Sequence, residues 1–158
     1  MTTLEPGMKA PAFRALAVGG TYGDAGKEVS LGEFAGQNVV LYFYPKDDTP
    51  GCTMQACGLR DAWSEVSEKC VLFGVSIDPA KSHAKFIAKH SLPFPLLVDE
   101  GHAMVEAFGV WVEKSLYGRK YMGTERTTFI IGPDGTLHAL LRKVKPGDHA
   151  AAVLEALK

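Results

Sequence analysis

The chain has 158 residues, of which 46% are apolar and 22% are charged, a composition typical of one compact domain with a buried core. Its 17 Lys and Arg nearly balance its 18 Asp and Glu, so no strong electric field favours nucleic acid or an anionic membrane as a partner. No stretch approaches the roughly 18 apolar residues that a membrane span requires. We therefore expect a single domain over residues 1–158 that is located in the cytoplasm and binds small neutral molecules.

Strands and helices are expected to alternate along the chain. Residues 12–31 are β-rich and precede two aromatic and β-branched runs, 38–44 and 71–77, which predict strands buried on both faces. A helix over about 50–68 lies between these two runs. The other expected elements are strands at 94–98, 127–131 and 136–141 and helices at 79–90, 103–108 and 149–157. This order predicts an α/β protein with a thioredoxin-like fold, in which a central mixed β-sheet is flanked by helices.

A cysteine lies in the first turn of the helix expected at 50–68. Thr49 suits the N-cap position and Pro50 suits the first helical position. Cys52 then falls near the third helical residue, where free backbone N–H groups and the helix dipole favour a thiolate over a thiol. Because a thiolate can attack the O–O bond of a peroxide, Cys52 is a candidate nucleophile, the alternative being a small residue that packs at a helix start.

A second cysteine follows five residues later, on a more polar side of the same helix. Cys57 is rotated by about 140° from Cys52, which places the two Cα atoms roughly 8–9 Å apart in an intact helix. A disulfide requires Cα atoms within about 7 Å of each other, so a bond between these cysteines needs the first helical turns to unwind. The spacing therefore predicts a local conformational switch on oxidation. Cys70 is expected to behave as a small buried hydrophobic residue.

The loop before this helix resembles a known family. Pro45, Thr49 and Cys52 reproduce the P-x-x-x-T-x-x-C motif of the peroxiredoxins, and TPGCTMQACGLRD resembles their bacterioferritin-comigratory-protein, or Q-type, subfamily. The resemblance implies a thioredoxin fold with an added N-terminal β-hairpin. It also implies that Cys52 is the peroxidatic cysteine, that Cys57 resolves it and that Pro45 shields it. Thr49 is then expected to hydrogen-bond the peroxide, and Arg126 to stabilise the thiolate and the developing charge.

The implied activity is the reduction of hydrogen peroxide and organic hydroperoxides, with thioredoxin or a similar dithiol as the reductant. This chemistry needs no metal, flavin or haem, and the five histidines are scattered without a close pair, so we expect no cofactor and no metal site. The histidines are expected to be solvated or partly packed. The subfamily resemblance makes a monomer the first expectation and a dimer the second. Gln55 is considered as a partner of Arg126, but an exposed helical glutamine is the commoner case.

Two other functions fit parts of the pattern. A thiol–disulfide oxidoreductase on the same fold normally has a C-x-x-C pair, which residues 52–55 lack, and it would exchange disulfides without consuming peroxide. A redox-sensing module would use the unwinding of the helix as a signal, and it would combine slow turnover with a stable oxidation-dependent partner. The segment 110–122 is less regular; a wall near Arg126 is one interpretation of it, but we expect it to pack as core or loop.

Overall fold

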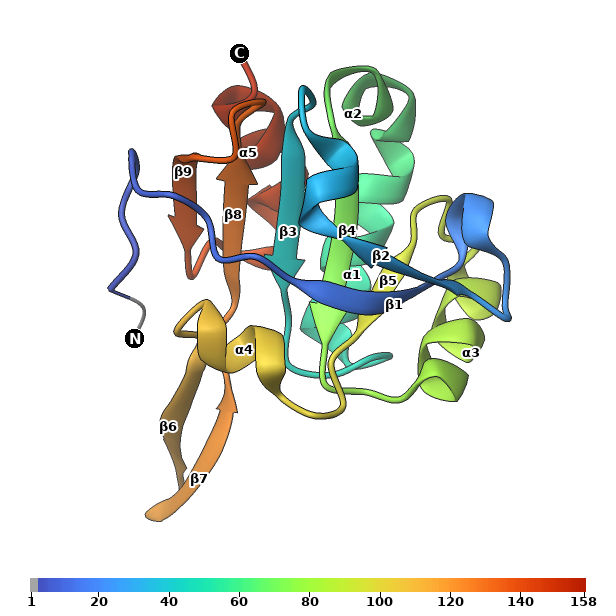
Figure 1. The fold of residues 1–158 in the computed structure, drawn as a ribbon. Coiled ribbons are helices and arrows are strands. Elements are labelled where there is room, and N and C mark those ends of the chain that lie inside the picture. The colour runs from blue at the N-terminus through green and yellow to red at the C-terminus, as the bar shows by residue number, and fades with distance from the viewer. Residues whose placement is uncertain (1–2) are drawn as a thin grey trace.

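The computed structural model describes residues 3–158, in which a seven-stranded sheet forms the centre of the fold (Figure 1). Its strands are β1 (Arg14–Val18), β2 (Lys27–Ser30), β3 (Val39–Phe43), β4 (Val71–Ser76), β5 (Leu96–Val98), β8 (Thr127–Ile131) and β9 (Leu137–Arg142). They lie side by side in the order β2-β1-β5-β4-β3-β8-β9. Strands β3, β4 and β5 run parallel to one another. Strand β8 pairs antiparallel with β3 and β9, and β1 pairs antiparallel with β5 and β2. The predicted α/β fold with a central mixed sheet is confirmed.

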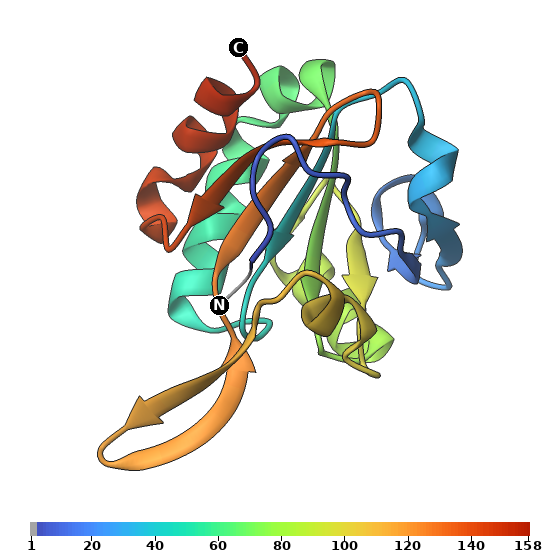
Figure 2. The same ribbon diagram turned by 60° about the vertical axis from the view of Figure 1, so that its left-hand side comes forward.

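Helices cover the sheet on both faces, and each face has its own hydrophobic core cluster. The helices are α1 (Pro50–Asp61), α2 (Trp63–Lys69), α3 (Ala80–His90), α4 (Ala103–Ala107) and α5 (His149–Ala156), with short 3-10 turns η1 (Gly20–Tyr22), η2 (Leu31–Phe34) and η3 (Pro146–Asp148). One cluster takes its buried helical side chains from α1, α2, α3 and α5, and the other takes them from α4. Figure 2 shows α1 and α5 together on one side of the sheet. Within residues 3–158, no helix combines the length and the apolar character needed to cross a membrane.

The helix predicted over 50–68 is wrong as a single element, because it is interrupted at Ala62. Helix α1 ends just before this residue and α2 begins just after it, and Ala62 has φ −98° and ψ 9°. The interruption turns α2 so that Trp63 packs against Phe94, with ring centroids 5.6 Å apart, while Val66 is fully buried. The apolar residues at 59 and 66 are about two helical turns apart. The helical periodicity of apolar residues therefore continues across Ala62, and the sequence gives no sign of the interruption.

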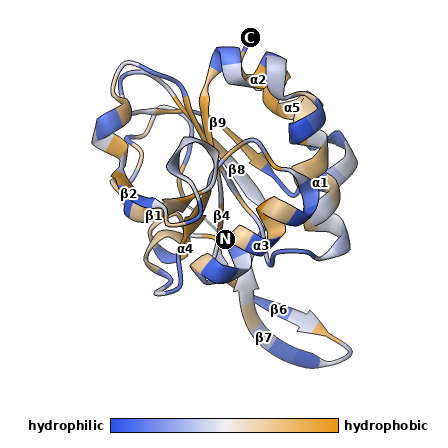
Figure 3. Ribbon diagram, turned by 90° about the vertical axis from the view of Figure 1, so that its right-hand side faces the viewer, coloured by the Kyte–Doolittle hydropathy of each residue, from blue (hydrophilic) through white to orange (hydrophobic). Residues whose placement is uncertain are grey.

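Two hairpins lie outside the central strands, and the sequence predicted only the N-terminal one. Strands β1 and β2 pair as the expected N-terminal hairpin, which extends the sheet through β5. The segment 110–122, expected to pack as core or loop, instead forms β6 (Trp111–Leu116) and β7 (Arg119–Thr124). Tyr117 and Gly118 connect them with φ of 50° and 77°, values that suit the tight two-residue turns of hairpins. This hairpin projects from the body of the molecule, with hydrophilic stretches along it (Figure 3).

Candidate active site

Cys52 lies at the start of α1, the helix that follows β3 in the chain. Thr49 is the N-cap residue with extended backbone angles, and Pro50 is the first helical residue, so Cys52 is the third, as predicted. The residue is only 1% exposed and is a free thiol. Free N–H groups of the first turn and the positive end of the helix dipole therefore act on a sulfur that is shielded from water.

Arg126, which directly precedes β8, contacts this sulfur. Its Nη1 atom lies 3.5 Å from Cys52 Sγ, although 74 residues separate the two in the sequence. The same Nη1 donates a hydrogen bond of 2.6 Å to the amide oxygen of Gln55. A permanent cation at this distance can stabilise negative charge that develops on the sulfur or beside it.

Gln55 is a partner of Arg126, which is the interpretation that the sequence made second to an exposed position. The expectation of an exposed helical glutamine is wrong, because Gln55 is 0% exposed. It follows Cys52 by three residues, so α1 places both side chains on the face that meets Arg126. That spacing from the cysteine was the only signal available in the sequence. The other amide atom of Gln55, Nε2, has no hydrogen-bond partner among residues 3–158.

Thr49 and Pro45 border the site from the loop that joins β3 to α1. The Thr49 hydroxyl makes no capping bond to α1 but donates a hydrogen bond of 2.8 Å to the Lys46 carbonyl. Because that bond uses the hydroxyl proton, the Thr49 oxygen can only accept a hydrogen bond from a further group. Pro45 is half-buried and lies in the wall of the same pocket as Arg126.

The pocket beside Arg126 has a volume of about 380 Å³ and a strongly cationic lining. Its walls are formed by Pro45, Lys114, Glu125, Arg126, Lys143, Val144, Lys145 and Pro146. Lys114 comes from the projecting hairpin, and burial, followed by the charge of Arg126, lowers the pKa of its ammonium group. The lining holds four cationic side chains and one carboxylate, so the pocket attracts groups that carry or develop negative charge.

The other two cysteines have different surroundings. Cys57 is half-buried on α1, and the helix is unbroken between it and Cys52, so the two stay at the helical spacing that forbids a disulfide. Cys70 packs against the core cluster that α1, α2, α3 and α5 help to form, and burial raises the pKa of its thiol to about 12. A thiol of this kind stays protonated at neutral pH and is a poor nucleophile.

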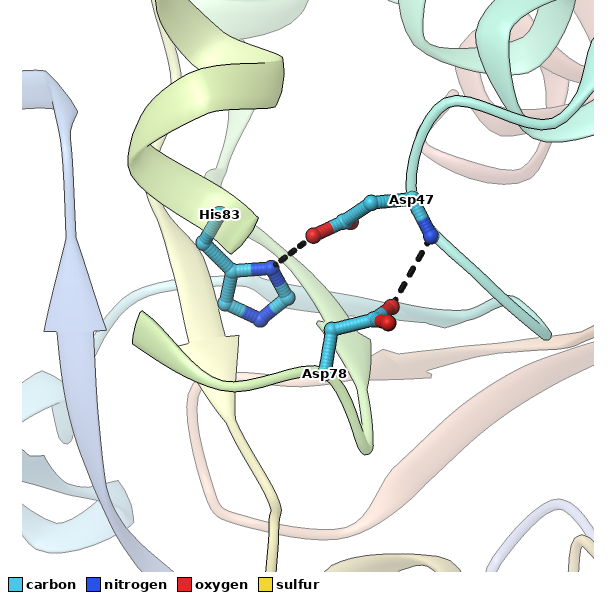
Figure 4. Close-up of side chains that lie close together, drawn as sticks. All are labelled: Asp47, Asp78 and His83. Atoms are coloured by element: carbon cyan, nitrogen blue, oxygen red, sulfur yellow. Dashed lines mark hydrogen bonds and ion pairs between the residues drawn. The ribbon is translucent and has the colours of Figure 1, made fainter. Parts of the chain in front are cut away.

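A second group of polar side chains joins the loop between β3 and α1 to α3 and to the segment that precedes α3 (Figure 4). Asp47, Asp78 and His83 come within 4.8 Å of one another through atoms of the kind that bind metals. Hydrogen bonds within the protein already engage these atoms, so their arrangement needs no ion to satisfy it. The expectation of solvated or partly packed histidines is wrong here, because His83 is 0% exposed and His149 is 1% exposed.

Comparison with known proteins agrees over almost the whole chain. Residues 6–140 match the model of the AhpC/TSA family. Peroxiredoxin Bcp of Bacillus subtilis (strain 168) is 48% identical over 157 residues, which cover 99% of this chain and 96% of that protein. A mutant of Xylella fastidiosa PrxQ has a TM-score of 0.89 at 31% identity and covers 99% of this chain and 97% of its own.

A third relative links the fold to a reaction. Xanthomonas campestris bacterioferritin comigratory protein, whose structure is described for its alkyl peroxide reduction activity, has a TM-score of 0.82 at 37% identity. The match covers 99% of this chain and 97% of that one. The resemblance to Q-type peroxiredoxins that the motif around Cys52 suggested is thus confirmed. The chain belongs to the AhpC/TSA family and is a thiol peroxidase of the peroxiredoxin type.

Proposed function

We propose that Cys52 is the nucleophile that reduces hydrogen peroxide and organic hydroperoxides. Its thiolate forms a bond to one peroxide oxygen while the O–O bond breaks, so the sulfur is oxidised to a sulfenic acid. The other oxygen leaves with the electron pair and takes up a proton to become water or an alcohol. The observation that carries this proposal is the 3.5 Å contact between Arg126 Nη1 and Cys52 Sγ at a helix N-terminus.

The neighbouring groups would each support one part of this step. Arg126 and the first-turn N–H groups stabilise the thiolate and the charge that moves to the leaving oxygen. The Thr49 hydroxyl donates its hydrogen bond to the Lys46 carbonyl, so its oxygen accepts a hydrogen bond from the O–H group of the bound hydroperoxide and orients it. Pro45 shields the sulfur from water, and Gln55 fixes the direction of the guanidinium.

Cys57 is proposed as the thiol that resolves the sulfenic acid. Its sulfur bonds to Cys52, water leaves, and the disulfide forms once the first turns of α1 have unwound. A dithiol reductant, which we propose to be thioredoxin, then exchanges with this disulfide and restores both thiols. We propose a monomer from the resemblance to Q-type peroxiredoxins, and the need for a reducing partner supports a cytoplasmic location.

Peroxide consumption with thioredoxin and its reductase tests these assignments. Cys52→Ser should lose even a single turnover, whereas Cys57→Ser should react once and then stall. Cys70→Ser is the matched control and should turn over like the wild type. Peroxide consumption by Cys52→Ser would make the central assignment wrong. Disulfide exchange by the wild type without peroxide consumption would favour the oxidoreductase alternative.

A further inference from the structure

His83, in the first turn of α3, is a fully buried histidine with an acceptor at each ring nitrogen. Its Nε2 atom lies 2.8 Å from the carbonyl oxygen of Leu97 in β5. A carbonyl can only accept, so Nε2 must carry a proton. Its Nδ1 atom lies 2.7 Å from Asp47 Oδ2, a contact drawn as a dashed line in Figure 4. A proton must also lie between these two atoms, either on the ring or on the carboxyl group.

Two arguments place that second proton on the ring. An aspartic acid side chain is intrinsically a stronger acid than an imidazolium by roughly 2.5 pKa units. The Asp47 carboxylate also accepts hydrogen bonds from the hydroxyls of Tyr44 at 2.6 Å and Ser82 at 2.8 Å, and such bonds favour its ionised form. Burial holds the pKa of Tyr44 well above its usual range, so its hydroxyl stays a donor. His83 and Asp47 therefore form a buried ion pair.

The charged groups around the pair are consistent with this assignment. Asp78, from the connection between β4 and α3, accepts from the backbone N–H of Asp47 at 2.8 Å and from the Ser76 hydroxyl at 2.6 Å. It adds a second negative charge within 4.8 Å of the ring of His83. The cations that border the groove beside Asp47 are Lys81, Lys85 and Lys89, all of which are exposed. Water screens these lysines more than it screens the buried carboxylates.

The second fully buried histidine provides an internal contrast. His149 Nε2 lies 2.7 Å from the Thr128 hydroxyl, and its Nδ1 has no partner among residues 3–158. Burial lowers the pKa of His149 to about 4, so this ring is neutral at pH 7. Two equally buried rings thus differ in charge, one neutral and one cationic, and the difference arises from the carboxylate that only His83 contacts.

We propose that His83 is an imidazolium that positions the active-site loop, residues 45–49, through its ion pair with Asp47. Asp47 lies in the middle of this loop and is held through both its side chain and its backbone N–H. The next residue, Asp48, has a positive φ of 58°, a strained conformation that surrounding contacts must maintain. Through Leu97 the ring is fixed to β5, so the loop is tied to the sheet and to α3 together.

His83 touches no reacting atom in this arrangement and is a positioning residue. Its role depends on the proposed function of Cys52, because the loop that it holds carries Thr49 and leads into α1. While the loop is held, the N-terminus of α1 and the Thr49 oxygen keep the geometry that peroxide attack requires. An unpaired Asp47 would instead be a buried carboxylate with one fewer donor, and the loop would shift to expose it to water.

The charge of His83 can be measured on the wild-type protein. Nuclear magnetic resonance of histidines labelled with ¹⁵N reports whether each ring nitrogen carries a proton. At pH 7 we expect protons on both nitrogens of His83 and on only one nitrogen of His149. A bare Nδ1 in His83 would overturn the proposal, whatever the enzyme does with peroxide.

The positioning role is tested by a double-mutant cycle in the Cys57→Ser background, where oxidation stops at the sulfenic acid. The rate constant for oxidation of Cys52 by hydrogen peroxide is followed by mass spectrometry in a single turnover. His83→Gln and Asp47→Asn should each lower it roughly 10- to 100-fold, as expected when a reacting group is misplaced by up to about 1 Å. The double variant should be no slower than the slower single variant, because both changes break one interaction.

The matched control is His149→Gln, which alters a histidine that is equally buried but neutral, and its rate constant should stay within about twofold of the parent. Unchanged rates in His83→Gln, or losses that multiply in the double variant, would contradict the proposal. If the parent itself forms no sulfenic acid at Cys52, the proposed function fails, while the resonance experiment still decides the charge of His83.

Discussion

Gln55→Leu separates the chemistry of the site from the stability of the fold. The substitution keeps a similar volume but removes the oxygen that accepts the 2.6 Å hydrogen bond from Arg126. A hydrogen bond to a charged group contributes about 1.5–3 kcal/mol. If this energy holds the guanidinium against Cys52, the rate constant for Cys52 oxidation should fall roughly 10- to 150-fold.

The free energy of unfolding of Gln55→Leu should change far less than its rate constant for Cys52 oxidation. The same substitution removes the buried Nε2 of Gln55, which has no partner among residues 3–158 and costs about 1–3 kcal/mol as an unsatisfied group. The two terms nearly cancel, so the free energy of unfolding should stay within about 1 kcal/mol of the wild type. Urea unfolding and single-turnover oxidation measure the two quantities, with Gln37→Leu at an exposed position as the control. An unchanged oxidation rate would refute the role of Gln55 in holding Arg126.

Four other positions give independent tests. Thr49→Val should slow Cys52 oxidation roughly 10- to 100-fold in single turnovers, and Thr49→Ser should retain most of the rate. Because burial raises the pKa of Cys70 to about 12, its alkylation, read by mass spectrometry, should be slow at pH 7 and rise about tenfold per pH unit below that value. Burial lowers the pKa of His149 from 6.5 when unfolded to about 4 when folded, so the unfolded chain binds an extra proton between these values. The free energy of unfolding should therefore fall by up to about 3 kcal/mol between pH 7 and pH 4, and His149→Gln should remove this loss. Gly58→Ala should stabilise α1 by about 1 kcal/mol and slow disulfide formation about fivefold, as followed by thiol titration.

The parts of the fold that the sequence predicts correctly are those with local causes. The apolar runs of β3 and β8 give strands in which every residue is buried, so composition alone marks them as central. The position of Cys52 follows from Thr49 and Pro50, whose backbone preferences begin a helix regardless of what packs on it. These signals need only a few neighbouring residues, and the order of the elements then limits the topology.

The parts that the sequence does not predict depend on contacts between distant segments. Gln55 resembles any exposed helical glutamine until β8 brings Arg126 to its face of α1. His83 contacts a carboxylate 36 residues earlier in the chain and a carbonyl 14 residues later. The hairpin of β6 and β7 has exposed residues on both faces, so hydrophobic alternation, which reports burial, is weak there.

Helix α1 is built so that the proposed unwinding has a natural end. Of the buried residues in the first turns, Cys52 and Ala56 are small and Gln55 is polar, so little apolar area is exposed when these turns leave the core. Leu59 is fully buried, and exposing it would cost about 1.5–3 kcal/mol. Gly58, just before it, weakens the helix by about 1 kcal/mol relative to alanine, although a Cβ there would meet only Ala150 at an ordinary 3.8 Å. Unwinding up to Gly58 frees both Cys52 and Cys57, and the burial of Leu59 opposes any further opening.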